Sequence, residues 1–287
     1  LQPGQKIFCF VPESGRFTTA YMLLTVVGEK TEGKGQKAEK VGEDGEVLSS
    51  ELYPSSPISP PSHSPTLPLT SSPSAYLLRN LALVWLEFER QLRSVPLIRK
   101  LHRGEFTLED YKRLLRNLRP QVVEGARWIA RAASNMTDFR LRSTFIGHAQ
   151  DEHRDFQMLE RNYVSVGGLL EEITQAEKNV GSEALSAYIF HQASRENPVD
   201  LIGSMFIIEG LGNNLAGKWA EQIKTTLNLR DEQVSFLAYH GANDESHLGK
   251  LNAIIHAEWM TQEIADRILK TARVTARLYL LQLEEMQ

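Results

Sequence analysis

Three side chains in the stretch FLAYHGANDESHLGKL, residues 236–251, have the types and spacing of a metal-binding stripe. His240, Asp244 and His247 recur at i, i+4 and i+7, so on an α-helix they fall within an arc of roughly 60°. Ionisable groups on a buried helix face carry a heavy desolvation cost unless a cation lies between them. A solvated polar face is the alternative interpretation, and a metal site needs further ligands from a second helix.

A second cluster with the same spacing lies in GHAQDEHRDFQML, where His148, Glu152 and Asp155 fall at i, i+4 and i+7. This segment also has a solvated helix face as its alternative. Glu209, in GSMFIIEGLGNN, is a further candidate metal ligand, because an ionised carboxylate among apolar residues needs a cation or strong hydrogen-bond donors. Its alternative is a position on a partly exposed face.

These segments together contain four carboxylates and up to three histidines that could converge on metal. The predicted metal ligands are His148, Glu152, Asp155, Glu209, His240, Asp244 and His247. A mixed oxygen and imidazole set of this size suits two iron ions, or manganese, in the core of a helical bundle. The single cysteine, Cys9, excludes an intrachain disulfide framework and any cysteine-rich zinc or iron–sulfur site.

The part of the chain from residue 74 to 287 is expected to be helical, because it shows helical periodicity and no strand-like alternation. Pro96 predicts a break, Gly104 a stop, and the TLED sequence at Thr107 a capping box closed by Asp110. Asn197 is expected to cap a helix with Pro198 at its first position. The predicted helices span residues 75–104 with the break, 107–135, 137–166, 170–178, 182–195, 198–227, the segment around 236–251, and 261–286. The predicted fold class is an all-α bundle.

The N-terminal part of the chain has a different character. Within residues 1–28, KIFCFV and AYMLLTVV read as two strands around the turn PESGR, which predicts a β-hairpin. Residues 29–73 are rich first in Gly, Lys and Glu and then in Pro and Ser, a composition typical of a disordered linker. Residues 1–28 resemble the C-terminal end of β-ketoacyl synthase III enzymes of the thiolase fold, which indicates either a gene fusion or a truncation remnant.

The composition excludes several functional classes. A net charge of −4 and a pI near 6.1, with Lys and Arg dispersed along the chain, argue against a nucleic-acid partner. No apolar run approaches the roughly 18 to 20 residues of a membrane span, and the N-terminus lacks the features of a signal peptide. We therefore expect a cytoplasmic protein with no membrane partner.

From residue 74 to 287 the chain resembles the haem oxygenase-like fold, and within it the non-haem di-iron oxidases and oxygenases. IGSMFIIEGLGNNLAG, FLAYHGANDESHLGKL, GHAQDEHRDFQMLERNYVSVGG and RLLRNLRPQVVEGARWIARAAS are each similar to a helix of that fold. The resemblance implies that Glu209, His240, Asp244 and His247 bind metal.

The first ligand helix departs from the family pattern, which places a Glu three or seven residues before a His. Here Asp155 stands at the His position, Glu152 lies three residues before it and His148 seven before it. It therefore stays open which of these three residues bind metal and whether both metal positions are filled.

The resemblance implies an enzyme, a non-haem di-iron oxidoreductase in which two Fe(II) ions reduce O₂ to a bridging peroxo species. That oxidant would attack a C–H or N–H bond of a small organic or acyl substrate; an external electron donor and a homodimer are both compatible with this activity. No NAD, flavin or haem signature is visible. The alternatives are a metal-free member resembling thiaminase-type or quinone-cofactor-synthesis proteins, and a non-catalytic helical domain fused to a ketosynthase.

Overall fold

The structure is a computed structural model that describes residues 6–10, 21–25, 72–242 and 254–286. Strands β1 (Lys6–Phe10) and β2 (Tyr21–Thr25) pair in a two-stranded sheet. The predicted turn between them and almost all of the predicted linker lie outside the described residues. The likeness of the N-terminal segment to a ketosynthase stays a prediction.

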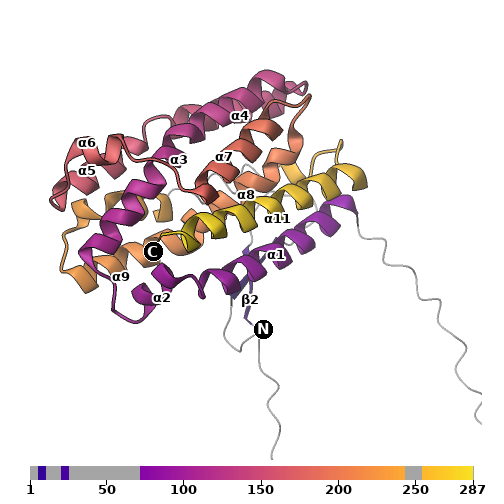
Figure 1. The fold of residues 1–287 in the computed structure, drawn as a ribbon. Helices are drawn as coiled ribbons and strands as arrows, with labels where there is room; N and C mark the ends of the chain where they lie inside the picture. The colour runs from indigo at the N-terminus through magenta and orange to yellow at the C-terminus, as the bar shows by residue number, and fades with distance from the viewer. Residues whose placement is uncertain (1–5, 11–20, 26–71, 243–253, 287) are drawn as a thin grey trace, which may run out of the picture. The chain divides into compact units, whose positions relative to one another are not determined.

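The helices belong to one compact unit and confirm the predicted all-α bundle in the described part of the chain (Figure 1). Helix α11 packs against α1, α7 and α8, whereas α3 packs against α4, α5 and α7, so that α7 joins the two groups. No described helix is both long enough and apolar enough to cross a bilayer. The elements are α1 (Pro73–Leu92), α2 (Pro96–His102), α3 (Leu108–Asn135), α4 (Phe139–Glu152), α5 (Phe156–Ser165), α6 (Leu170–Thr174), α7 (Val180–Ala193), the 3₁₀ turn η1 (Val199–Leu201), α8 (Ile202–Leu211), the π-helical η2 (Gly212–Ala216), α9 (Gly217–Leu227), the 3₁₀ turn η3 (Asp231–Gln233), a helical segment over 235–242, and α11 (Gln262–Glu284).

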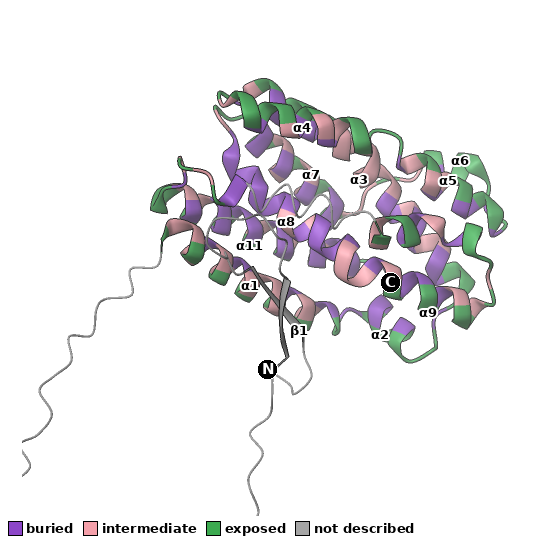
Figure 2. Ribbon diagram, turned by 180° about the vertical axis from the view of Figure 1, so that it is seen from behind, coloured by how far each residue is buried: buried purple, intermediate pink, exposed green. Residues whose placement is uncertain are grey.

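The bundle interior follows the apolar periodicity of the sequence. On α1, for example, Leu77, Leu81, Phe88 and Leu92 recur on one face and are at most 1% exposed. Each leucine buried in this way contributes roughly 1.5–3 kcal/mol to folding. Helix α8 is buried along most of its length (Figure 2), which makes it the most enclosed support for a functional side chain in the bundle.

The ends of the first helices lie where the sequence predicts them. Ser72 caps α1 through a hydrogen bond from the Ala75 N–H, so the helix starts one residue before the predicted helical domain. Pro96 opens α2 after a break, and Gly104 follows that helix with a φ of +71°, a conformation that glycine adopts without strain. The predicted breaks are therefore confirmed.

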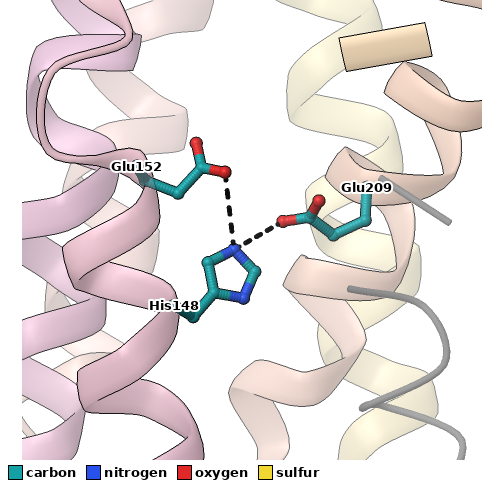
Figure 3. Close-up of side chains that lie close together, drawn as sticks. All are labelled: His148, Glu152 and Glu209. Atoms are coloured by element: carbon teal, nitrogen blue, oxygen red, sulfur yellow. Dashed lines mark ion pairs between the residues drawn. The ribbon is translucent and has the colours of Figure 1, made fainter. Parts of the chain in front are cut away.

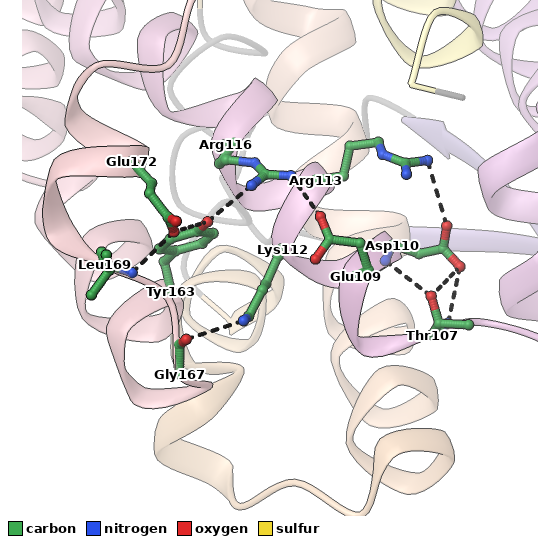
Figure 4. Close-up of polar contacts among 10 residues, drawn as sticks. All are labelled: Thr107, Glu109, Asp110, Lys112, Arg113, Arg116, Tyr163, Gly167, Leu169 and Glu172. Atoms are coloured by element: carbon green, nitrogen blue, oxygen red, sulfur yellow. Dashed lines mark hydrogen bonds and ion pairs between the residues drawn. The ribbon is translucent and has the colours of Figure 1, made fainter.

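The start of α3 is held by the predicted capping box and by contacts to α5 and α6 (Figure 4). The Arg116 guanidinium donates to the hydroxyl of the buried Tyr163 at 3.1 Å, and that hydroxyl donates to Glu172 at 2.8 Å. Lys112 donates to the carbonyl of Gly167 at 3.1 Å. These bonds fix the α5–α6 corner on α3 and thereby the position of α5.

The single helix predicted over residues 137–166 is wrong, because the structure divides it into α4 and α5. Between them the chain turns tightly over residues 153–155. The Asp155 N–H donates to the Glu152 carbonyl at 3.3 Å, an i→i+3 bond in place of the helical i→i+4 bond. No glycine or proline marks this turn, so local sequence carries no signal for it.

The helix predicted to begin at Pro198 with Asn197 as its cap also differs. Asn197 has a left-handed φ of 43° and its side-chain oxygen accepts the Thr137 N–H at 3.4 Å, so it joins two loops instead of capping a helix. The 3₁₀ turn η1 precedes α8, and the π-helical η2 separates α8 from α9. The single helix predicted over residues 198–227 is thus the short turn η1 followed by α8, η2 and α9.

Gly203 allows α8 and α11 to approach closely. A Cβ atom at this position would lie 2.2 Å from the Ile268 carbonyl oxygen and 2.7 Å from the Ala272 nitrogen, both backbone atoms that cannot move aside. Because real Cβ atoms do not approach so closely, any side chain here would push α8 away from α11. The close contact therefore sets the depth at which α8 lies in the bundle.

Substituting Gly203 tests this packing. We expect Gly203→Ala to lower the free energy of unfolding by about 1–3 kcal/mol, the usual cost of overpacking, as measured by urea denaturation. Gly147→Ala on α4 is the matched control, because a Cβ there meets no atom within 4 Å. That control should stabilise the protein by about 0.5–1 kcal/mol through helix propensity. Equal effects at the two positions would contradict the packing argument.

Asp110 predicts a pH dependence of stability. Burial alone would raise the pKa of Asp110, but hydrogen bonds from Lys100 and Thr107 outweigh burial and hold it below its ordinary value of 3.8. A carboxylate with a lowered folded pKa stabilises the protein at neutral pH and loses this contribution as pH falls through that pKa.

We therefore expect Asp110→Ala to cost about 1–3 kcal/mol at pH 7, with a difference from the native chain that shrinks as pH falls below 3.8. Urea denaturation at several pH values measures both quantities. Glu109→Ala, which removes an exposed neighbouring carboxylate, is the control and should have a smaller effect. A constant cost of Asp110→Ala down to pH 3 would refute the assigned role of its charge.

Candidate metal centre

The first part of the centre is built on the last turns of α4. His148 and Glu152 lie one turn apart on the same face, and Glu152 is the final residue of the helix. Asp138 caps the other end of α4 by accepting the Leu141 N–H at 2.7 Å. His148 is 2% exposed, so its imidazole faces the bundle interior and not solvent. The interpretation of this cluster as a solvated helix face is therefore wrong for His148.

Glu209 enters from α8, opposite α4. It is 6% exposed, as the apolar residues around it in the sequence predict. Its Oε1 lies 2.9 Å from His148 Nε2, and Glu152 Oε1 lies 3.8 Å from the same nitrogen. Figure 3 shows the two carboxylates converging on the imidazole from the two helices. The π-helical η2 begins three residues after Glu209, and such segments occur frequently at functional sites.

A second group of side chains adjoins the first. It contains Glu152, Asp155 and His240, and Asp155 Oδ2 lies 3.5 Å from His240 Nε2. Asp155 is the residue before α5 and is 7% exposed, whereas His240 lies on the helical segment 235–242. The Phe236 ring packs edge-on against the His240 imidazole with centroids 4.6 Å apart, which fixes the orientation of the imidazole.

Glu152 belongs to both groups. In the first group, one potential ligand atom from each of His148, Glu152 and Glu209 can be chosen so that all three atoms lie within 4.8 Å of one another. The same is true of Glu152, Asp155 and His240 in the second group. Two atoms bound to one ion at about 2.1 Å each can be at most about 4.2 Å apart, so side-chain shifts of roughly half an ångström would suffice. Glu152 is therefore the residue of the described set that could contribute a ligand to both groups.

The tight turn between α4 and α5 determines which way the potential ligands face. On one straight helix, His148, Glu152 and Asp155 would form a single stripe facing one point. Because the chain turns after Glu152, Asp155 instead faces His240 while His148 faces Glu209. The turn therefore divides the predicted stripe between two neighbouring groups.

Asn162 holds α5 against the segment that carries His240. Its side-chain amide donates to the Glu232 carbonyl at 2.8 Å and to Ser235 Oγ at 2.9 Å, and its oxygen accepts the Phe236 N–H at 3.0 Å. Asn162 is fully buried, so these bonds form without competition from water. They position Asp155 and His240, which lie on the two joined elements.

A second close contact acts on the same segment. A Cβ at Gly241 would lie 2.7 Å from the Cα and N of Gly217, so the helical segment 235–242 crosses α9 at backbone contact. Gly217 directly follows η2 and Gly241 directly follows His240. The crossing thereby links the backbone next to His240 to the chain that leads away from Glu209.

The structure brings together five of the seven residues predicted to bind metal: His148, Glu152, Asp155, Glu209 and His240. The other two, Asp244 and His247, lie outside the described residues. Within the described set, all three residues of the atypical ligand cluster on α4 and α5 take part, so the structure does not favour one of them over the others. Metal binding by any of the seven stays a prediction.

The chemistry of this donor set fits divalent metal ions. Three carboxylates and two imidazoles lie within or beside an interior cavity, and burying an ionised carboxylate costs several kcal/mol unless positive charge compensates it. The described lining of that cavity includes no lysine or arginine. Two divalent cations would more than offset three carboxylate charges, and imidazole with carboxylate is a ligand combination that iron and manganese accept.

The cavity next to the cluster has a volume of about 110 Å³, well above the room needed for a single water molecule. Its lining is mainly apolar and includes Leu114, Leu118, Trp128, Ile208, Trp219 and Phe236, beside His148, Glu152, Glu209 and His240. Sequence reasoning missed two polar lining residues, Gln121 on α3 and Tyr279 on α11. For Gln121 a signal existed, because it continues the inward-facing positions Leu114 and Leu118 at helical spacing.

Sequence comparisons find no relative of this chain: no family model matches it, and no curated protein sequence does. Solved structures do resemble it. A domain of unknown function with a haem oxygenase-like fold from Shewanella denitrificans OS217 superposes with a TM-score of 0.67 at 21% identity, covering 71% of this chain and 88% of that one.

Two TenA homologues are also similar. The one from Pseudomonas syringae pv. tomato DC3000 has a TM-score of 0.60 at 13% identity and covers 79% of this chain and 99% of its own. The one from P. horikoshii OT3 has a TM-score of 0.55 at 17% identity, with coverages of 75% and 98%. Identities this low support the fold alone. The helical part of this chain has the haem oxygenase-like fold.

Proposed function

We propose that this protein is an O₂-dependent non-haem di-iron oxidase or oxygenase that acts on a small organic or acyl substrate. The observation that carries the proposal is the position of Glu152 in two adjoining groups of ligand-type side chains. A site for one ion needs a single group of three or four ligands. Two groups that share a carboxylate match the arrangement by which two metal ions are held close together.

Each residue has a role in this proposal. His148 and Glu209 would hold one ion, Asp155 and His240 the other, and Glu152 would contribute to both. When bound, two Fe(II) ions would supply electrons for the reduction of O₂. The reduced oxygen would then serve as the oxidant for a C–H or N–H bond. The carboxylates neutralise the cations, and the Phe236 ring keeps the His240 imidazole oriented.

Asp244 and His247 complete the proposed ligand set from the sequence. With them, the second ion would have imidazole and carboxylate donors from two helices, as the i, i+4 and i+7 spacing with His240 predicts. Manganese has similar ligand preferences and is the alternative metal. The full proposed set would give the two ions seven protein ligands.

The cavity supports an organic substrate. Apolar side chains including Trp128, Ile208 and Trp219 line it beside the ligand cluster. This lining favours burial of hydrocarbon and disfavours bulk water, which would compete at the site. An apolar substrate in the cavity would have its C–H bonds next to the proposed metal centre. If the substrate does not itself provide all electrons for O₂ reduction, an external donor is required.

The similarity to TenA homologues leaves a metal-free member of the fold as the second candidate. A heterocycle bound without metal would then occupy the cavity. The two candidates differ in one property, the amount of metal that the folded chain retains.

Metal content tests the proposal first. Protein loaded anaerobically with Fe(II) and then desalted should retain about two iron ions per chain, as measured by elemental analysis. His148→Ala and His240→Ala should each reduce the content toward one ion, because they act on different groups. Glu152→Ala should weaken both sites.

Two exposed neighbours serve as controls. His153→Ala and Asp151→Ala remove side chains of the same types that point to solvent, and both variants should keep the full iron content. A native chain that retains no metal would eliminate the di-iron function in favour of the metal-free candidate. Loss of both ions in His148→Ala and also in His240→Ala would contradict the assignment of the two histidines to separate metal-binding groups.

Oxygen consumption tests the reaction class. The iron-loaded chain should consume O₂ faster with apolar acyl compounds present than without them, as an oxygen electrode measures. Glu209→Ala should lower that rate by about 100-fold or more, the scale of losing a metal-ligand interaction. Iron binding without any O₂ consumption over a broad substrate panel would instead indicate a structural metal site.

A further inference from the structure

Two polar side chains line the cavity in addition to the proposed metal ligands. Gln121 comes from α3 and Tyr279 from α11, and neither belongs to the proposed metal centre. The Tyr279 ring is fixed by edge-on packing against Phe88, with centroids 6.2 Å apart. Tyr279 is 6% exposed, so its hydroxyl lies in the protein interior. A defined polar pair thus occurs within a largely apolar cavity.

The protonation of Tyr279 follows from its surroundings. Burial raises the pKa of Tyr279, and the neighbouring Gln121 side chain opposes that shift only in part. Tyr279 therefore keeps its proton at neutral pH. The pair therefore offers a ligand one donor, the Tyr279 O–H, and one acceptor, Gln121 Oε1.

The acceptor lacks a partner in the described part of the chain. Gln121 Oε1 is shielded from solvent and receives no hydrogen bond there. A buried acceptor without a donor costs about 1–3 kcal/mol. A ligand that brings an N–H or O–H to this oxygen would recover that cost, which makes the position a recognition point for a donor.

Charge limits the group that fits. The described cavity lining contains no lysine or arginine, so without metal a carboxylate or phosphate bound at this pair would be buried without a counter-charge. An ester would accept from Tyr279 and leave Gln121 Oε1 without a donor. A neutral primary amide has a carbonyl acceptor and an N–H donor on the same side of its C–N bond, which matches the donor and acceptor of the pair.

We propose that Gln121 and Tyr279 select a hydrophobic amide as the substrate of this cavity. The Tyr279 O–H donates to the amide carbonyl, the amide N–H donates to Gln121 Oε1, and the hydrocarbon part packs against Trp128, Trp219 and Leu118. This assignment names the substrate class of the proposed di-iron site and rests on that proposed function. It adds that the substrate is neutral and that these two residues determine specificity.

A pair of probes with and without an N–H donor tests the assignment. Octanamide and methyl octanoate have the same chain and carbonyl, but only the amide has an N–H on the carbonyl side. Titration of the full-length protein by tryptophan fluorescence measures binding, because Trp128 and Trp219 line the cavity. We expect the amide to bind about tenfold more tightly than the ester, the worth of one well-placed hydrogen bond. In the chain without iron, octanoate, which is charged, should bind more weakly than either.

The variants assign the selectivity to the pair. Gln121→Leu should bring the amide-to-ester ratio close to one, and Gln121→Met should do the same if the leucine variant folds poorly. Tyr279→Phe should weaken amide and ester alike, by about threefold to tenfold, because both use the carbonyl. Tyr188→Phe, which removes a hydroxyl near Thr271 outside the cavity lining, is the matched control and should change neither affinity.

Running the titrations with and without bound iron separates this inference from the function it rests on. If the chain binds no iron but still prefers the amide through Gln121, the di-iron function is excluded and the recognition pair is supported. If the chain binds iron, equal affinities for amide and ester or unchanged selectivity in the Gln121 variants would overturn the recognition pair alone. Tighter binding of octanoate than of the amide to the chain without iron would do the same.

Discussion

The central physical constraint in this protein is the cost of placing several carboxylates in its interior. Glu152, Asp155 and Glu209 converge with two imidazoles, and each ionised carboxylate there would cost several kcal/mol without compensating charge. Unless a chain gains function from them, three such side chains are worse for stability than apolar residues of the same size. Divalent cations between them would convert this unfavourable arrangement into strong binding, and the proposed function follows from that compensation.

The rest of the bundle is arranged so that these side chains meet. Close backbone contact at Gly203 places α8, and thus Glu209, at a fixed depth against α11. The tight turn after α4 directs Asp155 toward His240 instead of Glu209. Asn162 then ties α5 to the helical segment of His240. Backbone contacts and buried hydrogen bonds of this kind define position more narrowly than apolar packing, which suits a site whose ligand atoms must lie within a few tenths of an ångström.

The sequence allowed the ligand types, the all-α class and many helix ends to be predicted, because these depend on local features. The apolar residues around Glu209 predicted its burial, and the TLED sequence predicted the capping box of α3. The turn between α4 and α5 could not be predicted, because no glycine or proline marks it and tertiary contacts decide it. The prediction of Asn197 as a helix cap was wrong for a related reason, because asparagine occurs both at helix caps and in left-handed loop conformations. Tyr279 lies far from the ligands in sequence, so its place in the cavity emerged only from the packing of α11.

Anomalous X-ray scattering at the iron edge, from crystals grown anaerobically with Fe(II), tests the central claim most directly. We expect two peaks about 3.5–4 Å apart, with the Glu152 carboxylate between them, His148 and Glu209 on one peak, and Asp155 and His240 on the other. A single peak, or two peaks of which only one contacts Glu152, would contradict it.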